Sequence, residues 1–274
     1  VVFRDRVLFA SDDGYLYCVS AEAGELLWRF RGGPSERKVI GNRRVISTWP
    51  ARGGPVLEDG TVYFAAGIWP FMGTFIYALD AETGEVLWLN DATSAEFQEQ
   101  PHSAPSFAGV APQGQMAVAG DELLIPGGRS LPAILDRHTG EQLYFDFGGK
   151  GEGGSFVAAG INHYYVHTRA RGTMALNMDD GTSAKFAVNE PVIDGNTLYT
   201  ATDSAADSAA DRAADREFEA PTIIAYGEDK TIQWSIMADG TGDLIRCGRR
   251  LYAAGNNSIT AINLPTANMP ASIA

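Results

Sequence analysis

The sequence predicts an all-β chain, and three observations support this prediction. Short runs of alternating apolar and polar residues, bounded by Gly, Asp and Asn, occur throughout the 274 residues. Sustained periodicity near 3.6 residues, which is typical of amphipathic helices, is almost absent. A unit with one pattern also returns along the chain, as "GYLYCVSAEAGELLW" at 14–28 and "FIYALDAETGEVLW" at 75–88. The chain is therefore expected to be a repeat protein built from strands.

Each unit is expected to form four short antiparallel strands. In the second copy these are "PVLEDG", "TVYFAAG", "FIYALD" and "EVLW", and the tight turn "AETG" joins the last two. An Asp or Ser at the start of this turn can hydrogen-bond the turn backbone, and Gly24, Gly84 and Gly140 supply a positive φ. One sheet of this size cannot bury both of its faces, so neighbouring copies must stack. Four-stranded copies that stack radially make a β-propeller.

Six copies can be traced, which predicts about six blades, within a possible range of six to eight. The copies begin near Val1, Arg52, Met116, Ser155, Glu190 and Asp243. The sixth copy, "DLIRCGRRLYAAGNNSITAINL", ends without its outermost strand. Residues 1–274 are expected to form a single propeller domain. The Ala-rich segment 203–221 inside the fifth copy is expected to be a disordered or helical insertion.

An aromatic residue follows the tight turn at a nearly constant offset in the first five copies. Because each such side chain buries a large area, we expect these residues to cover the seams between neighbouring blades. They are Trp28, Trp88, Tyr144, Phe186 and Trp234.

The repeated unit, with its "GE" turn and final Trp, resembles the PQQ-like repeat of quinoprotein alcohol dehydrogenase-like β-propellers. The resemblance implies a propeller fold over most of the chain. If the chain were a quinoprotein dehydrogenase, the resemblance would also imply a bound pyrroloquinoline quinone and a calcium ion. In those enzymes the quinone packs against a disulfide of adjacent cysteines, and Glu, Asn and Asp bind the calcium. This sequence has no adjacent cysteine pair and no motif that matches the metal ligands, so no cofactor or metal is expected. The same repeat builds non-enzymes, including the lipoprotein scaffold of the outer-membrane β-barrel assembly machinery.

The two cysteines, Cys18 and Cys247, are too far apart in sequence for a CxxC motif or a zinc site. Two buried thiols are expected, because free cysteine is among the most buried residue types. A disulfide between the first and last copies remains an alternative.

The balance of charge is acidic, with 21 Lys and Arg against 34 Asp and Glu, a net charge of −13. Nucleic acid and anionic membranes are therefore poor partners, since both favour basic surfaces. No run approaches the roughly 18 apolar residues of a membrane span. The chain opens on "VVFRDRVLFA" without a Met or a leader-like segment. We expect a bacterial protein exported to the periplasm or the exterior, with an upstream signal, and fusion to another domain is left open.

Loops on one face of a propeller are the expected place for function. The connection between blades and the loop between the second and third strands share this face. Ten of the 21 basic residues fall there: Arg31, Arg37, Lys38, Arg43, Arg44, Arg52, Arg129, Lys150, Arg169 and Arg171. Guanidinium groups bind carboxylates or phosphates, and aromatic rings stack on sugars. The predicted ligand-binding residues are Arg43, Arg44, Trp49, Arg52, Trp69, His102, Arg129 and Arg169.

Two alternatives stand beside this prediction. Any single arginine can instead pair with a carboxylate such as Glu36 or Glu99, or pack its stem on a neighbouring blade. His102 and His167 are the candidates for proton transfer, with His102 as the catalytic candidate, although a single loop histidine is more often structural. His138 is expected to have only a structural role, in the "RHTGE" turn on the opposite face.

The favoured function is a non-catalytic binding or scaffold module that receives an anionic small molecule, a glycan or a protein partner. One alternative is an enzyme, either a quinoprotein-like oxidoreductase or a lyase or hydrolase acting on acidic sugars in the axial funnel. The other alternative is a disc that only binds proteins. No HExxH, GxSxG or phosphate-loop motif supports another catalytic class.

Overall fold

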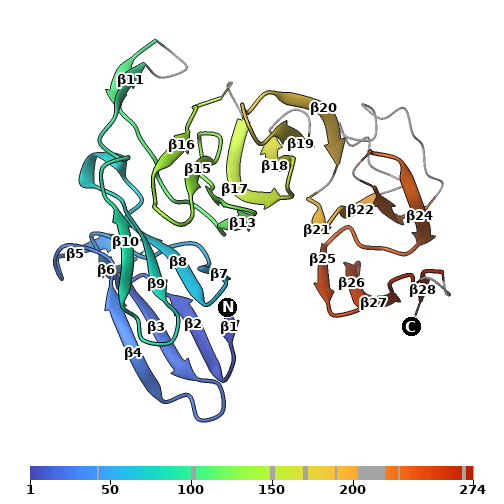
Figure 1. Ribbon diagram of the computed structural model, residues 1–274, viewed down its shortest axis with the longest axis horizontal. Helices are drawn as coiled ribbons and strands as arrows, with labels where there is room; N and C mark the ends of the chain where they lie inside the picture. Colours follow the sequence, from blue (N-terminus) through green and yellow to red (C-terminus); the bar gives the residue numbers. More distant parts are fainter. Residues whose placement is uncertain are drawn as a thin grey trace. The chain divides into compact units, whose positions relative to one another are not determined.

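The computed structural model describes residues 1–41, 43–99, 103–148, 152–168, 172–188, 190–202, 220–227, 229–266 and 270–273. Within these ranges the chain is built from strands, apart from one short 3-10 turn, η1 (Pro70–Met72). Six sheets of four strands follow one another along the chain (Figure 1). The predicted all-β fold with four-stranded antiparallel blades is confirmed.

The strands cross each sheet in chain order, so that neighbours in sequence are neighbours in the sheet. Blade 1 consists of β1 (Val2–Phe3), β2 (Arg6–Ala10), β3 (Tyr15–Ser20) and β4 (Leu26–Arg31). Blade 2 consists of β7 (Val56–Glu58), β8 (Thr61–Ala66), β9 (Phe75–Asp80) and β10 (Val86–Asn90). Blade 3 consists of β13 (Ala117–Ala119), β14 (Glu122–Ile125), β15 (Ala133–Asp136) and β16 (Gln142–Tyr144).

The remaining three blades follow the same order. Blade 4 consists of β17 (Glu152–Ala159), β18 (His163–Thr168), β19 (Gly172–Asn177) and β20 (Ser183–Val188). Blade 5 consists of β21 (Val192–Asp194), β22 (Thr197–Thr202), β23 (Thr222–Tyr226) and β24 (Ile232–Met237). Blade 6 consists of β25 (Asp243–Cys247), β26 (Arg250–Gly255), β27 (Ser258–Asn263) and β28 (Ser272–Ile273).

The chain divides within β17 into two compact units, Val1–Val157 and Ala158–Ala274. We describe each unit by itself, and the prediction of a single domain over 1–274 stays a prediction. The predicted insertion at 203–221 also stays a prediction, because its residues 203–219 lie outside the described part of the chain.

A hydrophobic core of the first unit runs through blades 1 to 3. Leu16 from blade 1, Phe64 from blade 2 and Leu135 from blade 3 belong to this core and are fully buried. In β8, which belongs to the middle blade, every residue after Thr61 is buried. Strands covered on both faces lose the apolar and polar alternation that marks a half-exposed strand. Stacking of blade 2 between its neighbours therefore explains the apolar run "VYFAA".

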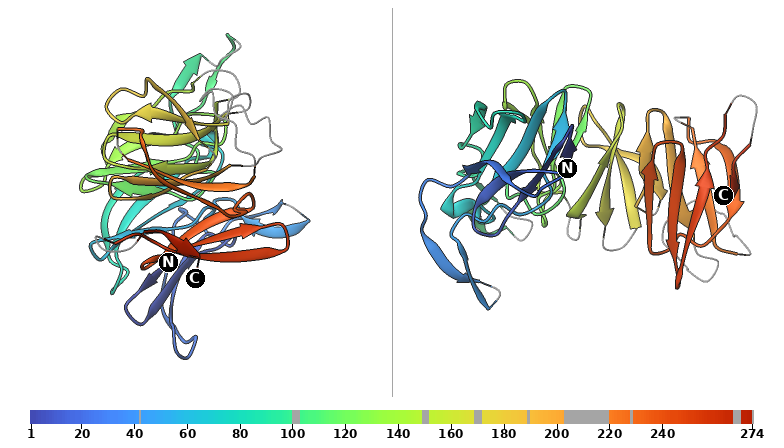
Figure 2. Two further views of the ribbon diagram at one scale, coloured as in Figure 1. Left: turned by 90° about the vertical axis from the view of Figure 1, so that its right-hand side faces the viewer. Right: turned by 90° about the horizontal axis from the view of Figure 1, so that it is seen from below.

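A second core joins blades 5 and 6. All five residues of β23 are buried, and Ile223 packs in one cluster with Leu251 and Ile262 of blade 6. Figure 2 shows the strands of these two blades side by side.

Two small hairpins lie in stretches that the sequence predicted only as long loops. β5 (Lys38–Gly41) pairs with β6 (Arg44–Ser47) between blades 1 and 2. β11 (Phe97–Glu99) pairs with β12 (Pro105–Phe107) between blades 2 and 3. Strands of three or four residues are too short to carry a recognisable alternation, which explains why they were missed.

The sixth blade is complete, which corrects the prediction that it lacks its outermost strand. Residues Ser272 and Ile273 form β28, in which Ile273 pairs with Ile262 of β27. A strand of two residues without a "GExxW" pattern gives no signal in the sequence.

Both cysteines are free thiols, but only one of them is buried. Cys18 lies in the core of the first unit, as predicted. The prediction is wrong for Cys247, which ends β25 and is exposed, because the chain turns back at the surface through Gly248 with φ +57°. No helix among the described residues has the length and apolar character that a membrane crossing requires.

Candidate functional site

Two tryptophans join neighbouring blades in the first unit. The indole Nε1 of Trp28 donates to the Glu82 carbonyl of blade 2 at 3.1 Å. The Nε1 of Trp88 donates to the Arg137 carbonyl of blade 3 at 2.9 Å. The Trp28 ring lies over the turn glycine of the next blade, so that a Cβ on Gly84 would come within 2.9 Å of it. The predicted seam role is confirmed for Trp28 and Trp88.

The turns that receive these tryptophans are built as the sequence predicted. Gly24, Gly84 and Gly140 have φ values of +69°, +75° and +75°. The Asp136 carboxylate accepts hydrogen bonds from the Thr139 N–H at 2.8 Å and the Thr139 hydroxyl at 3.0 Å. These bonds, led by the backbone N–H of Thr139, hold the pKa of Asp136 below its ordinary value.

The opposite set of loops in the first unit meets on one face, as predicted. Backbone and side-chain hydrogen bonds connect the loops of blades 1, 2 and 3 in succession. The bonds are Ala51 N–H to the Ser11 carbonyl, Gly67 N–H to the Pro50 carbonyl, Gln113 Nε2 to the Ile68 carbonyl and Gln113 N–H to the Pro126 carbonyl. We call this surface the loop face of the first unit, consisting of the described loop residues 11–14, 32–41, 43–55, 67–74, 91–99, 103–116 and 126–132.

Two of the predicted ligand-binding arginines converge on one carboxylate. Arg44 Nη2 lies 2.5 Å from Asp12 Oδ2, and Arg52 Nε lies 2.9 Å from Asp12 Oδ1. The Asp12 side chain is only 24% exposed, so the pair of bonds is partly shielded from water. For these two residues the structure shows the ion pairing that the sequence left as an alternative. Arg31 likewise approaches Glu36, at 3.9 Å.

The other predicted residues are distributed over the same face. Arg43 is exposed at the tip of the β5–β6 hairpin, with φ +63°. Arg129 is exposed in the β14–β15 loop. Trp49 is half-buried, and its Nε1 donates to the Met72 carbonyl at 2.8 Å. Trp69, which begins the η1 turn, is 38% exposed. His102 and Arg169 lie outside the described residues, so the ligand-binding set stays a prediction.

The remaining histidine predictions have different outcomes. His138 lies in the β15–β16 turn, where its backbone N–H donates to Asp136 Oδ1 at 2.8 Å, so its turn role is confirmed. Its ring Nε2 lies 3.0 Å from Asp121 Oδ1. His167 is part of β18 rather than a loop, opposite Thr173 in the register. Its predicted role in proton transfer stays untested.

Sequence reasoning missed the apolar side chains that the two hairpins display on the loop face. Ile40 and Val45 are direct cross-strand neighbours, 86% and 67% exposed. Phe97 and Phe107 are also cross-strand neighbours, 64% and 56% exposed, with ring centroids 5.2 Å apart. The segments "KVI" and "RVIS" could have indicated two paired strands, but they lie inside a basic stretch, which hides the pattern.

No cluster of three or more His, Cys, Asp or Glu side chains that could hold a metal ion is found within the described ranges. Six successive four-stranded blades, with tryptophans docked on the turns of the next blade, define a β-propeller of PQQ-like repeats. The chain belongs to the family described as outer membrane protein assembly factor BamB, which matches residues 1–213.

Solved structures share the fold at low sequence identity. BamB from Moraxella catarrhalis is 11% identical with a TM-score of 0.54, over 95% of this chain and 70% of that one. Quinohemoprotein alcohol dehydrogenase from Comamonas testosteroni is 13% identical with a TM-score of 0.55. The quinohemoprotein alcohol dehydrogenase ADHIIG from Pseudomonas putida HK5 is 12% identical with a TM-score of 0.53. This chain is covered completely in both enzymes but spans only 58% of their length. Comparison with curated proteins finds no similar sequence.

Proposed function

We propose that this chain is a non-catalytic β-propeller scaffold that binds a protein partner through the loop face of its first unit. The observation that carries the proposal is the pair of hairpins on that face, each with an exposed apolar cross-strand pair. Large apolar side chains grouped on an otherwise charged surface mark interaction sites. Paired strands hold such side chains in a fixed orientation, which lowers the entropy cost of docking.

A protein partner is favoured over a small anion because the loop arginines are already neutralised in part. Arg44 and Arg52 share the Asp12 carboxylate, so a small anion would have to displace that pairing. Exposed Lys38 and Arg43 flank the apolar pair of the β5–β6 hairpin. Apolar side chains with a basic rim suit an apolar segment with acidic neighbours on the partner.

The family suggests where the partner belongs. Its description names outer membrane protein assembly, and BamB is the name of one of the solved structures with this fold. We place the chain in the bacterial cell envelope, in the periplasm, and propose that its partner is a protein of the outer-membrane assembly machinery. An anionic small molecule or a glycan on the same face is the alternative ligand.

Binding of the purified assembly machinery to the immobilised chain tests the proposal. The variant Ile40→Ser with Phe107→Ser should bind at least about tenfold more weakly, because buried apolar anchors dominate interface energies. The control is Ile259→Ser, which removes a 76% exposed isoleucine from blade 6. The control should bind like the unchanged chain.

Two results would contradict the proposal. One is unchanged binding in the double variant. The other is a characteristic quinone absorbance after reconstitution with pyrroloquinoline quinone and calcium, which would support the oxidoreductase alternative. Retention on an acidic saccharide that is lost in Arg43→Ala with Arg129→Ala would move the site to the alternative ligand.

A further inference from the structure

The seam between blades 4 and 5 departs from the pattern of the first unit. There a tryptophan lies over a turn glycine, as Trp28 does over Gly84. In blade 4 the docking position holds Phe186, and the turn of blade 5 holds Lys230 four residues before its tryptophan, where blade 2 has its glycine. Lys230 has φ +65°, so it keeps the backbone conformation of the glycine while adding a long side chain.

Phe186 and Lys230 form a different junction from the tryptophan and glycine pair. The Phe186 ring meets the Tyr226 ring edge to face, with centroids 5.4 Å apart. The Lys230 ammonium lies 5.6 Å from the Phe186 ring centroid and donates to the Ala184 carbonyl at 2.8 Å. Because an ammonium has three hydrogens, two remain available after this bond.

The arginines that cross the seams of the first unit have no counterpart in the β17–β18 turn of blade 4 or at Gly227, which stands in the β23–β24 turn of blade 5 where blade 3 has Arg137. Arg4, in the β1–β2 turn, bonds Glu82 of the next blade at 2.7 Å. Arg137 of blade 3 bonds Asp59 of blade 2 at 2.9 Å. The β17–β18 turn of blade 4 holds Ile161 and Asn162 instead. The smaller ring and the uncharged turn leave this seam open.

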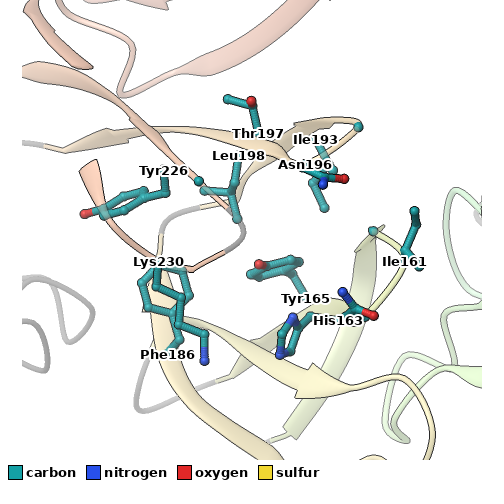
Figure 3. Close-up of a pocket in the computed structure, with 14 residues that line it drawn as sticks. Ile161, His163, Tyr165, Phe186, Ile193, Asn196, Thr197, Leu198, Tyr226 and Lys230 are labelled. Atoms are coloured by element: carbon teal, nitrogen blue, oxygen red, sulfur yellow. The ribbon is translucent and has the colours of Figure 1, made fainter. Parts of the chain in front are cut away.

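The result is a small hollow along the seam, open to solvent, whose described lining residues all belong to the second unit. Figure 3 shows Tyr165 across its middle, with Phe186 and Lys230 on one side and Ile161 and Ile193 on the other. Sites for small ligands combine apolar and aromatic walls with a few placed polar groups. The described lining has both kinds of group, with Ile193 and Phe186 beside Lys230.

The charge of the lining differs from that of the chain. The chain has 34 acidic residues, yet none of the described residues that line the hollow is Asp or Glu. The nearby Asp229 carboxylate is held by the Thr231 N–H at 3.1 Å and the Thr231 hydroxyl at 2.6 Å. The nearby Asp194 carboxylate is paired with Arg246 at 2.8 Å. Lys230 therefore supplies a positive charge to the described lining.

Tyr165 adds a neutral donor. Burial raises its pKa to about 12, so that the hydroxyl keeps its proton at neutral pH. Within the described part of the chain no hydrogen-bond partner of this hydroxyl is found.

We propose that the seam hollow between blades 4 and 5 binds a small aromatic carboxylate, with the carboxylate at Lys230 and the ring among Ile161, Ile193 and Leu198. An ammonium and a hydroxyl can both donate to a carboxylate, and apolar walls on both sides suit a flat ring. A sugar acid fits less well, because the apolar side chains of Ile161, Ile193 and Leu198 offer its ring hydroxyls no hydrogen-bond partner. This site does not depend on the proposed protein-binding function, which lies in the other unit.

Titration calorimetry of the whole chain with benzoate tests the proposal. We expect a Kd at or below about 1 mM, and at least about tenfold weaker binding of benzamide, the uncharged analogue. Lys230→Gln should weaken benzoate binding by at least about tenfold. The matched control, Lys38→Gln, removes an exposed lysine from the first unit and should leave benzoate binding unchanged.

A second variant tests the origin of the hollow. Phe186→Trp with Lys230→Gly restores the docking pair, so it should abolish benzoate binding without lowering the melting temperature. The proposal is overturned if benzoate fails to bind at about 10 mM, if benzamide binds equally well, or if glucuronate binds more tightly than benzoate. The benzamide comparison uses the unchanged chain, so it tests the need for the carboxylate charge even if Lys230→Gln folds poorly.

Discussion

At the scale of single residues, two turn glycines with the same backbone conformation have different surroundings. Gly24 and Gly84 have φ values of +69° and +75°. Nothing lies within 4 Å of a Cβ placed on Gly24, whereas a Cβ on Gly84 comes within 2.9 Å of the Trp28 ring. The two positions therefore separate the cost of backbone strain from the cost of displacing a docked tryptophan.

We predict that Gly24→Ala lowers the free energy of unfolding by about 1 kcal/mol, the cost of a positive φ in an L-residue. Gly84→Ala should lower it by about 1 to 3 kcal/mol more, because the Trp28 ring must also move. Urea denaturation followed by tryptophan fluorescence measures both values. Equal losses in the two variants would show that the Trp28 ring can move at no energetic cost and is therefore not tightly packed on the Gly84 turn.

The lowered pKa of Asp136 predicts a pH dependence of stability. Hydrogen bonds, first from the Thr139 backbone and then from the Thr139 hydroxyl, favour the charged carboxylate in the folded state. A folded pKa below the unfolded value contributes stability that is present above the unfolded pKa, about 3.9, and is lost as pH falls through the folded pKa. Asp136→Asn should therefore destabilise the chain at pH 7 and differ little from the unchanged chain near pH 2.

Urea midpoints across this pH range check the prediction, with Glu22→Gln at another exposed turn as the control. A penalty for Asp136→Asn that is the same at both ends of the range would mean that turn geometry, rather than the carboxylate charge, supplies the stability.

The contacts of a single residue could be predicted where the repeat determines them. The tryptophan and glycine motif recurs from copy to copy, so a contact between Trp28 and the next blade could be expected although Glu82 lies 54 residues away. Arg44 and Arg52 find Asp12 across 32 and 40 residues of sequence. The register of an inserted hairpin determines that contact, and neither spacing nor composition encodes it. The sequence could therefore offer ion pairing and ligand binding only as alternatives.

At the scale of elements, the β5–β6 hairpin has one face toward the protein and one toward solvent. Val39 pairs with Ile46, and Ile40 pairs with Val45. Ile46 is 3% exposed, whereas Ile40 is 86% exposed. Side chains alternate along a strand, so a shift of one residue in register would exchange these two environments.

We predict that Ile46→Ala lowers the free energy of unfolding by about 2 to 5 kcal/mol, because it removes buried methyl groups. Ile40→Ala in the same hairpin should change it by less than about 0.5 kcal/mol. Chemical denaturation of the two variants measures the difference. A reversed order would show that the hairpin has slipped by one residue.

Blades and hairpins differed in how well the sequence predicted them. The blades were predictable because each one repeats its own turn and alternation, so that six copies indicated six sheets. β28 and the two inserted hairpins consist of strands with two to four residues, which carry too few alternations to recognise. In the sequence, the open seam between blades 4 and 5 appears only as a departure from the repeat, with Phe186 and Lys230 in place of a tryptophan and a glycine. That departure became meaningful only after the arrangement of the blades was known.

At the scale of the whole molecule, charge is the property that the sequence determines directly. The net charge of −13 gives a repulsion that opposes the compact state at neutral pH and is relieved on unfolding. Ion pairs across the surface oppose this repulsion, among them those of Arg4 and Arg44, whose side chains are both 64% exposed. An exposed pair typically contributes about 0 to 1 kcal/mol, so we expect the net repulsion to dominate.

We predict that raising NaCl from about 10 mM to about 500 mM increases the melting temperature by several degrees. The screening length falls from about 30 Å to below about 8 Å over this range, which suppresses repulsion between distant carboxylates more than attraction between touching pairs. A gain of about 1 kcal/mol corresponds to about 2 to 4 °C for a chain of this size. Scanning calorimetry at both concentrations gives the shift. Neutralising the exposed Glu22, Glu25 and Glu85 by Gln should reduce the salt effect, and a melting temperature that falls with salt would show that the ion pairs outweigh the repulsion.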